Sequence, residues 1–320
     1  MTARPLSLRR WAAALVCVSL LAPPAPAAAD ELKPKTLDTF NRYVALTETR
    51  MDAEVASADA FLWVDGLAEP RRAKEFAKLR RGKVLSEKLK TLDNRQEIKD
   101  SDGRIHHWVA MVFIPGAKLN DVLGLMQNYD NYAEFFKKDA FFSLMKDYND
   151  HGLDWCKPEV ARSKVLSRDG NDFRTEMRIV QKLALDYSGP CIFWIFCSTP
   201  WSTYVLDMEQ EIHYVPLDAA RVRMRTVATH IVPVENADKS SERQLPPSGM
   251  LWRYNTYWRF QERDGGTYVQ CEIAALSRRV SMFVSPYYRV DESFARVFPA
   301  FLLGTMRGIL LERQKSTAKP

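Results

Sequence analysis

The 320-residue sequence predicts an α+β fold, in which a curved antiparallel sheet wraps around a long C-terminal helix and a helical extension precedes the sheet. Three observations lead to this prediction. Between residues 84 and 277, apolar and polar side chains alternate in long runs separated by short turns, as in antiparallel strands. After Pro299, apolar residues recur at helical spacing. The same spacing is found over residues 37–63.

Residues 251–277 form the clearest predicted hairpin. Two alternating runs flank the turn Asp264-Gly265-Gly266, and a glycine turn of this kind is a strong short-range signal of a hairpin. In the first run, one side carries Trp252, Tyr254, Trp258 and Phe260, and the other carries Arg253, Asn255, Tyr257 and Arg259. Because the aromatic side must face something apolar, we expect a helix, a ligand or both against it.

The run over residues 105–114 is apolar on both faces, with Trp108 and Val112 on one side and His107 on the other. A strand covered on both faces needs a layer outside the sheet, and the N-terminal helix is the natural candidate. A short helix is expected over residues 119–126. Further strands are expected at residues 84–92, 160–167, 173–185, 204–215 and 221–232.

The last two of these strands predict a ladder of opposite charges. A three-residue turn near Pro216 would set Glu211 opposite Arg223 and Glu209 opposite Arg225. Such pairs contribute a few tenths of a kcal/mol each on a solvent-facing side. We interpret the ladder as structural and not as catalytic.

Residues 1–29 have the pattern of a cleavable export signal. Three arginines precede a short apolar run, and small residues lead up to Ala29, so we expect cleavage near Ala29 and export to a bacterial periplasm. Removal of these arginines lowers the formal net charge from +6 to about +3, which does not indicate a nucleic-acid partner. We expect a monomer with a helical extension at residues 30–78, a main domain at residues 79–315 and a disordered tail at residues 316–320.

Cys191 and Cys197 bracket five apolar and aromatic residues, 192–196. In an oxidising compartment these cysteines could form a disulfide that closes a short loop. Three interpretations of the aromatic loop stay open: core packing, a lid over a cavity, or contact with a membrane surface. No metal is expected, because the sequence has no CxxC pair and the adjacent His106 and His107 would point to opposite faces of a strand.

Four motifs resemble the START-like, SRPBCC-type helix-grip superfamily, which includes Bet v 1-like proteins. They are GRIHHW at residues 103–108, VFIPG at 112–116, NYDNY at 128–132 and LWRYNTYWRF at 251–260. The resemblance covers roughly residues 79–311 and points to a group of exported bacterial members. It implies a helix-grip fold with a hydrophobic cavity for lipids, sterols, quinones or polyketide-like molecules. It does not imply one activity, because one fold hosts many functions.

The phase of the strands and of the last helix predicts which side chains line such a cavity. The candidates are Trp108, Val112, Met177, Met224, Trp252, Tyr254, Trp258, Phe301, Leu302 and Met306. Four polar residues could lie in the cavity as ligand or acid–base groups: His107, Arg178, Tyr257 and Glu272. The favoured interpretation is that they form cross-strand pairs on the outer face, with Arg259 and Glu272 as one such pair.

We therefore expect binding or transport of a hydrophobic small molecule in the cell envelope, without catalysis and without a cofactor. No nucleophile elbow, phosphate-binding loop or dinucleotide fingerprint is present, and no catalytic residue is assigned. A cyclase- or aromatase-like enzyme is the alternative, and it requires inward polar groups such as His107 and Tyr257. A third hypothesis is an envelope scaffold that uses the basic residues 71–83 and the aromatic loop, both of which also suit transient membrane contact.

Overall fold

The structure is a computed structural model. It describes residues 32–57, 60–100, 102–137, 156–184, 201–234, 251–278 and 296–317. All of them belong to the second of two compact units, Met1–Asp30 and Glu31–Pro320. The predicted export signal, Cys191, Cys197 and the aromatic loop between these cysteines lie outside the described residues.

The described chain is organised by an antiparallel sheet of eight strands in the order β1-β4-β10-β9-β8-β7-β6-β5. The strands are β1 (Leu85–Lys88), β4 (Gly103–Pro115), β5 (Cys156–Asp169), β6 (Asp172–Ala184), β7 (Trp201–Pro216), β8 (Arg221–Pro233), β9 (Leu251–Arg263) and β10 (Gly266–Arg278). A small ribbon of β2 (Leu92–Asp93) and β3 (Gln96–Glu97) connects β1 to β4. The pairing of β4 with β10 brings the first long strand beside the last.

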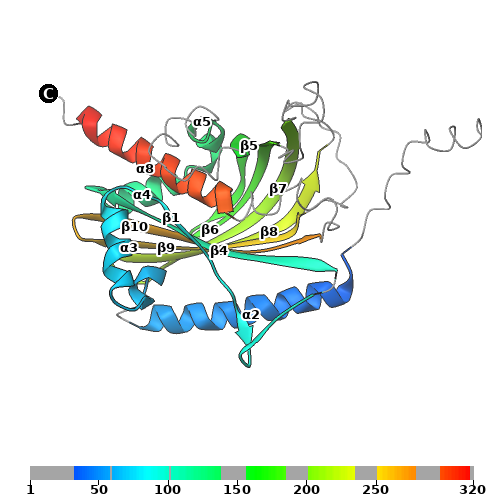
Figure 1. Ribbon diagram of the computed structural model, residues 1–320. Coiled ribbons are helices and arrows are strands. Elements are labelled where there is room, and N and C mark those ends of the chain that lie inside the picture. Colours follow the sequence, from blue (N-terminus) through cyan, green and yellow to red (C-terminus); the bar gives the residue numbers. More distant parts are fainter. Residues whose placement is uncertain are drawn as a thin grey trace, which may run out of the picture. The chain divides into compact units, whose positions relative to one another are not determined.

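The helices cover both faces of this sheet, as Figure 1 shows. They are α2 (Pro34–Ala56), η1 (Trp63–Gly66), α3 (Arg71–Arg80), α4 (Leu119–Met126), η2 (Tyr129–Asn131), α5 (Tyr132–Phe135) and α8 (Phe298–Thr317). We call the face covered by α8 the inner face and the face covered by α2 the outer face. Among the described helices, none has the length and apolar character needed to cross a lipid bilayer.

Two sets of buried contacts define the faces. On the inner face, Phe301 and Met306 of α8 belong to the same apolar cluster as Val112 of β4. On the outer face, Phe40 of α2 packs with Leu276 of β10. The sheet and its C-terminal helix confirm the predicted α+β helix-grip fold. The outer helices explain why β4 is apolar on both sides.

The N-terminal helix is shorter than the pattern predicts. Residues 37–63 have helical spacing, but α2 ends at Ala56, and Phe61 and Leu62 leave the helix to enter a separate apolar cluster beneath α3. Both side chains are fully buried there, beside Val109 of β4. Burial of these large side chains outweighs the gain from extending the helix by two turns.

The predicted hairpin of residues 251–277 is confirmed. Asp264 and Gly265 join its strands with φ angles of +56° and +75°. Two consecutive positive φ angles are typical of the type I′ turn, whose twist matches that of the flanking strands. Glycine adopts this conformation without the steric cost of a Cβ atom.

A β-bulge near the start of β9 corrects one prediction. Arg253 pairs with Leu276 of β10 and Leu251 pairs with Ser277, so Trp252 has no partner in β10. The alternation of faces along β9 is therefore interrupted at Trp252. Trp252 consequently packs with Phe40 of α2 on the outer face, whereas Tyr254 stays in the inner cluster. The predicted inward position of Trp252 is wrong, because an extra residue in one strand reverses the faces of those before it.

The predicted charge ladder between β7 and β8 is also wrong. His213 lies opposite Arg225, and Glu211 lies opposite Val227, so the register differs by four residues from the one that a three-residue turn would set. The shift preserves the faces but exchanges every cross-strand partner. Arg223 and Arg225 instead bind carboxylates of α2.

Candidate functional site

A pocket of about 50 Å³ lies on the inner face, between the sheet and the start of α8. We call it the inner pocket. It is lined by Met126, Tyr129, Tyr132, Phe136, Met177, Gln210, Ile212, Met224, Thr226, Tyr254, Thr256, Trp258, Cys271, Phe298, Pro299 and Leu302. Its walls therefore come from the central strands, from the segment after α4 and from α8.

Two tyrosines shape one wall of the inner pocket. The ring of Tyr132 lies 5.0 Å from that of Tyr129 and 4.9 Å from that of Phe136, measured between centroids. The hydroxyls of Tyr129 and Tyr214 share a hydrogen bond of 2.6 Å, and Tyr132 donates one of 2.6 Å to the carbonyl of Met126. The hydroxyls are thus satisfied within the protein, and the wall is aromatic.

The inner pocket is electrically neutral. Its lining, as described, contains no histidine, carboxylate, lysine or arginine. Burial raises the pKa values of Tyr129, Tyr132 and Tyr254 well above the ordinary value for tyrosine. Burial and the nearby charge of Glu272 raise the pKa of the Cys271 thiol in the same way. These groups remain uncharged at physiological pH because the low-polarity surroundings disfavour the ionised form.

The polar atoms of the pocket come from amides and hydroxyls. Gln210, Thr226 and Thr256 point inward from β7, β8 and β9, and each is at least nine-tenths buried. The indole Nε1 of Trp258 donates a hydrogen bond of 2.9 Å to Oγ1 of Thr256. Such groups can orient a ligand by hydrogen bonding but are poor acids and bases near pH 7.

The predicted lining residues fall into three groups. Those that line the inner pocket are Met177, Met224, Tyr254, Trp258 and Leu302. Those that belong to the inner apolar cluster, or pack against it, away from the pocket are Trp108, Val112, Phe301 and Met306. Trp252 lies on the outer face because of the bulge in β9.

Sequence reasoning missed one wall of the pocket. Met126, Tyr129, Tyr132 and Phe136 lie three or four residues apart, which is the spacing of one helical face. The expected helix ends at Met126, and residues 128–132 enter the sequence analysis only as the NYDNY motif of the resemblance. The signal was present in the sequence as an aromatic periodicity that runs through η2 and α5.

The four predicted polar groups lie outside the inner pocket. His107 of β4 shares hydrogen bonds with the Tyr43 hydroxyl of α2 (2.7 Å) and with Oε1 of Glu272 (2.6 Å). The Tyr257 hydroxyl donates to Oε1 of Glu48 in α2 (2.8 Å). These contacts place His107, Tyr257 and Glu272 beneath α2 on the outer face, where the favoured interpretation expects them.

Glu272 is the buried anion of this face, with 1% of its side chain exposed. Burial opposes its ionisation, but the hydrogen bond and charge of His107 and the positive charges of Arg50 and Arg259 outweigh burial and lower its pKa. Arg50 binds the same carboxylate oxygen directly. The expected pair of Arg259 with Glu272 is wrong, since Arg259 donates to Glu54 of α2 (2.7 Å).

Arg178 also lies on the outer face. It is 1% exposed and binds Asp207 of β7 through two hydrogen bonds of 2.7 Å, from Nε and Nη2. Its neighbours in the strand, Met177 and Ile179, belong to the inner cluster. Arg178 of β6 and Asp207 of β7 thus form a cross-strand pair, as the favoured interpretation predicts. Among the described residues, no ion pair joins β6 to α2.

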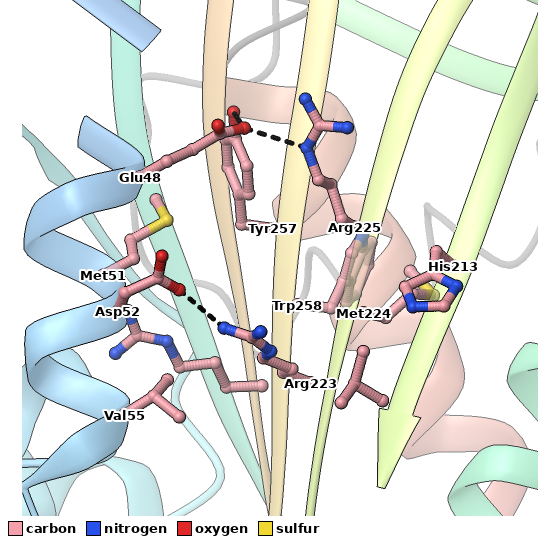
Figure 2. A pocket seen from close by; sticks show the side chains of 12 residues that line it. Glu48, Met51, Asp52, Val55, His213, Arg223, Met224, Arg225, Tyr257 and Trp258 are labelled. Atoms are coloured by element: carbon pink, nitrogen blue, oxygen red, sulfur yellow. Dashed lines mark hydrogen bonds and ion pairs between the residues drawn. The ribbon is translucent and has the colours of Figure 1, made fainter. Parts of the chain in front are cut away.

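A second, larger pocket of about 220 Å³ lies between α2 and the outer face of β7, β8 and β9. We call it the outer pocket, and Figure 2 shows its side chains. It is lined by Glu48, Met51, Asp52, Val55, His213, Val215, Arg223, Met224, Arg225, Tyr257, Trp258 and Arg259. Arg223 donates to Asp52 (2.6 Å) and Arg225 to Glu48 (2.8 Å), so two ion pairs bridge the gap between helix and sheet.

Neither pocket offers an evident metal centre. Among the described residues, no three His, Cys, Asp or Glu side chains gather closely enough to hold an ion. His106 and His107, adjacent on β4, are held apart: His106 shares a hydrogen bond of 2.8 Å with the Ser277 hydroxyl, while His107 faces α2.

No protein-family model and no curated protein matches the sequence. Solved structures with a similar fold include a STAR-related lipid transfer protein from Xanthomonas axonopodis, at 14% identity and a TM-score of 0.36, covering 66% of this chain and 96% of that one. The Zhui aromatase/cyclase from a Streptomyces species has 10% identity and a TM-score of 0.39, with 67% and 99% covered. Human STARD10 has 8% identity and a TM-score of 0.35, with 83% and 87% covered. At these identities the likenesses concern the fold alone.

Proposed function

We propose that this protein binds a hydrophobic small molecule, such as a lipid, sterol or quinone, between the inner face and α8, without transforming it. One observation carries the proposal: the inner pocket has aromatic and apolar walls whose polar atoms are all uncharged. Such a lining desolvates an apolar molecule at no electrostatic cost, since no buried charge has to be compensated.

Binding requires the inner pocket to widen. Its volume of about 50 Å³ is well below the roughly 300–1,000 Å³ of typical ligand pockets. Three methionines, Met126, Met177 and Met224, line it. Methionine side chains are long, unbranched and polarizable, so they adapt to ligands of different shape at little cost. We infer that a ligand enters by displacing these side chains and the adjoining turn of α8.

The apolar contribution of a small ligand falls short of micromolar affinity by itself. A ligand that buries about 300 Å² of apolar surface gains about 7 kcal/mol at roughly 25 cal/mol per Å². The cost of association and of moving side chains reduces this gain. Binding in the micromolar range, near 8 kcal/mol, therefore needs a ligand that buries somewhat more surface or also bonds Gln210 or Thr256.

The lining disfavours the enzyme hypothesis. That hypothesis requires titratable side chains to converge in the cavity, and its two named candidates, His107 and Tyr257, lie across the sheet beneath α2. The amides and hydroxyls of the inner pocket orient a ligand but do not exchange protons readily near pH 7. Export to the cell envelope remains part of the proposal and depends on residues 1–29 alone.

Native mass spectrometry with lipid extraction tests the proposal on protein purified from its own host. We expect an apolar molecule to co-purify with the wild type and to be lost from Leu302→Trp, because the indole fills the inner pocket. Leu166→Trp is the matched control, since Leu166 is 41% exposed on β5 and should retain the ligand. A molecule that stays bound to Leu302→Trp would place its site elsewhere, and chemical conversion of the bound molecule would favour the enzyme.

A further inference from the structure

We propose that the outer pocket is a second binding site, which takes a small organic anion: a carboxylate or phosphate ester with an apolar body. It lies on the face of the sheet opposite the inner pocket, so its ligand and the proposed hydrophobic ligand occupy separate places. Its volume of about 220 Å³ is below the roughly 300 Å³ of pockets for drug-sized molecules, which indicates a small ligand.

The apolar part of the outer pocket comes from both layers. Met51 and Val55 face the sheet from α2, one helical turn apart, and Val215 contributes from β7. Met224 and Trp258 border the pocket at its floor, but their side chains belong to the inner cluster. The side chains of Met51, Val55 and Val215 would cover the hydrocarbon body of a ligand.

Two arginines and a histidine lie on the same face of the sheet, and the histidine, His213, shares a hydrogen bond of 2.5 Å with Asp172. Arg223 and Arg225 are two residues apart on β8 and therefore share a face, and His213 lies directly opposite Arg225 on β7. Figure 2 shows the two arginines on neighbouring positions across from α2. Their side chains are 40% and 52% exposed, so a ligand from solvent can reach them.

The arginines retain bonding capacity beyond their bridges to α2. Asp52 accepts one hydrogen bond from Nη1 of Arg223, and Glu48 accepts one from Nε of Arg225. A guanidinium has five N–H donors, so most of each fork is available to a further acceptor. Carboxylates and phosphates match this fork better than any neutral group does.

The charges of the lining also favour an anion. Three arginines line the outer pocket against two carboxylates, and the carboxylate that neutralises Arg259, Glu54, lies outside the lining. The arginines and carboxylates of the lining thus sum to a net positive charge. Because ion pairs this exposed contribute little to stability, an anionic ligand displaces weak contacts when it binds the arginines.

Calorimetric titration of the purified protein with 2-naphthoate and with its neutral amide, 2-naphthamide, tests the proposal. We expect naphthoate to bind at least about tenfold more tightly than naphthamide, as a charge-assisted hydrogen bond predicts. Arg223→Gln and Arg225→Gln should remove most of this difference. Arg174→Gln, an exposed arginine of the same face that pairs with Glu209, is the control and should preserve it.

The variant Asp52→Asn distinguishes two hypotheses for Arg223: that it binds a ligand, and that it serves only in a structural ion pair with Asp52. Asp52 is 68% exposed, so the variant should fold, and it releases Arg223 from its competing carboxylate. The proposal predicts several-fold tighter naphthoate binding by Asp52→Asn. Unchanged or weaker binding by this variant would overturn the proposal, as would equal affinities of the wild type for the acid and the amide.

The two pockets are distinguished in the same titration. Leu302→Trp, which fills the inner pocket, should leave naphthoate binding unchanged. If this variant abolishes naphthoate binding while Arg223→Gln and Arg225→Gln do not, the anion occupies the inner pocket and the outer site is refuted.

Discussion

The two faces of the sheet are built on opposite principles. On the inner face, α8 packs through Phe301 and Met306 against apolar strand residues, and the titratable groups there are neutral. On the outer face, α2 is joined to the strands by ion pairs and hydrogen bonds, among them those of Arg50 and Glu54. A single sheet thus separates an uncharged layer from an ionic one.

This contrast predicts how each face responds to a ligand. Apolar contacts are non-directional, so the inner layer can exchange side-chain contacts for ligand contacts without leaving a buried group unsatisfied. The buried ions of the outer layer require their partners to stay in place. We therefore expect the inner face to adapt its shape, whereas the outer face binds only at its exposed edge beside Arg223 and Arg225.

Removing the buried anion should produce the largest loss of stability. Glu272→Ala leaves His107 and Arg50 without their shared carboxylate, and breaking a buried pair in this way costs about 3–5 kcal/mol. Asp52→Ala removes an exposed ion pair from the same helix–sheet interface and should cost less than about 1 kcal/mol. Urea unfolding measures both. Similar losses would show that burial does not distinguish the two pairs.

Shortening a side chain of the inner layer should have a somewhat smaller effect. Met306 of α8 is fully buried, and Met306→Ala should lower the free energy of unfolding by about 2–5 kcal/mol through lost contacts and a new cavity. Leu166→Ala, at an exposed position, is the control and should change it little. If Met306→Ala cost nothing, α8 would not be packed against the sheet as described.

The smallest effect concerns pH. Burial, with the positive charges of Arg104 and Lys88, lowers the pKa of His106 to about 3. The unfolded chain binds this proton below about pH 6.5 and the folded chain does not, so stability falls as the pH decreases from 6.5 towards 3. Between pH 6.5 and 5 the loss should be about 1.5 kcal/mol.

Unfolding curves at both pH values check this expectation. His106→Gln should remove most of the dependence in this range, whereas His213→Gln, at an exposed histidine, should retain it. The depressed pKa of Glu272 acts in a lower range, since the stability that it contributes is lost only below the ordinary pKa of a glutamate. An unchanged slope in His106→Gln would show that the inner side of β4 tolerates a charge.

Local patterns were sufficient for most of the elements, although not for the end of α2. The turn at Asp264 and Gly265, the bounds of α4 and the alternation along β4 depend on residues that are near each other in the chain. The same alternation predicted that His106 and His107 point apart. Half of the predicted cavity residues line the inner pocket for this reason, because strand and helix periodicity decides the face on which a side chain lies.

Two of the errors concern relations between elements. The bulge that turns Trp252 outward depends on one residue of pairing with β10. The partners of Arg223 and Arg225 changed because loop geometry set a different register between β7 and β8. Apart from Trp252, the alternation within the strand was predicted correctly in both cases. The residue opposite each position on the neighbouring strand was not, because alternation within one strand does not specify the register between two strands.

The sequence by itself thus determined the α+β class, the hairpin, the amphipathic helices and the neutral, aromatic character of one strand face, since these depend on side-chain periodicity. The folded structure was needed to show which carboxylates of α2 meet the strand arginines, that His107, Tyr257 and Glu272 bond at this interface, and that a second pocket lies beneath the helix. The physical reason is distance along the chain: Glu48 and Arg225 are 177 residues apart, and no local pattern encodes their contact.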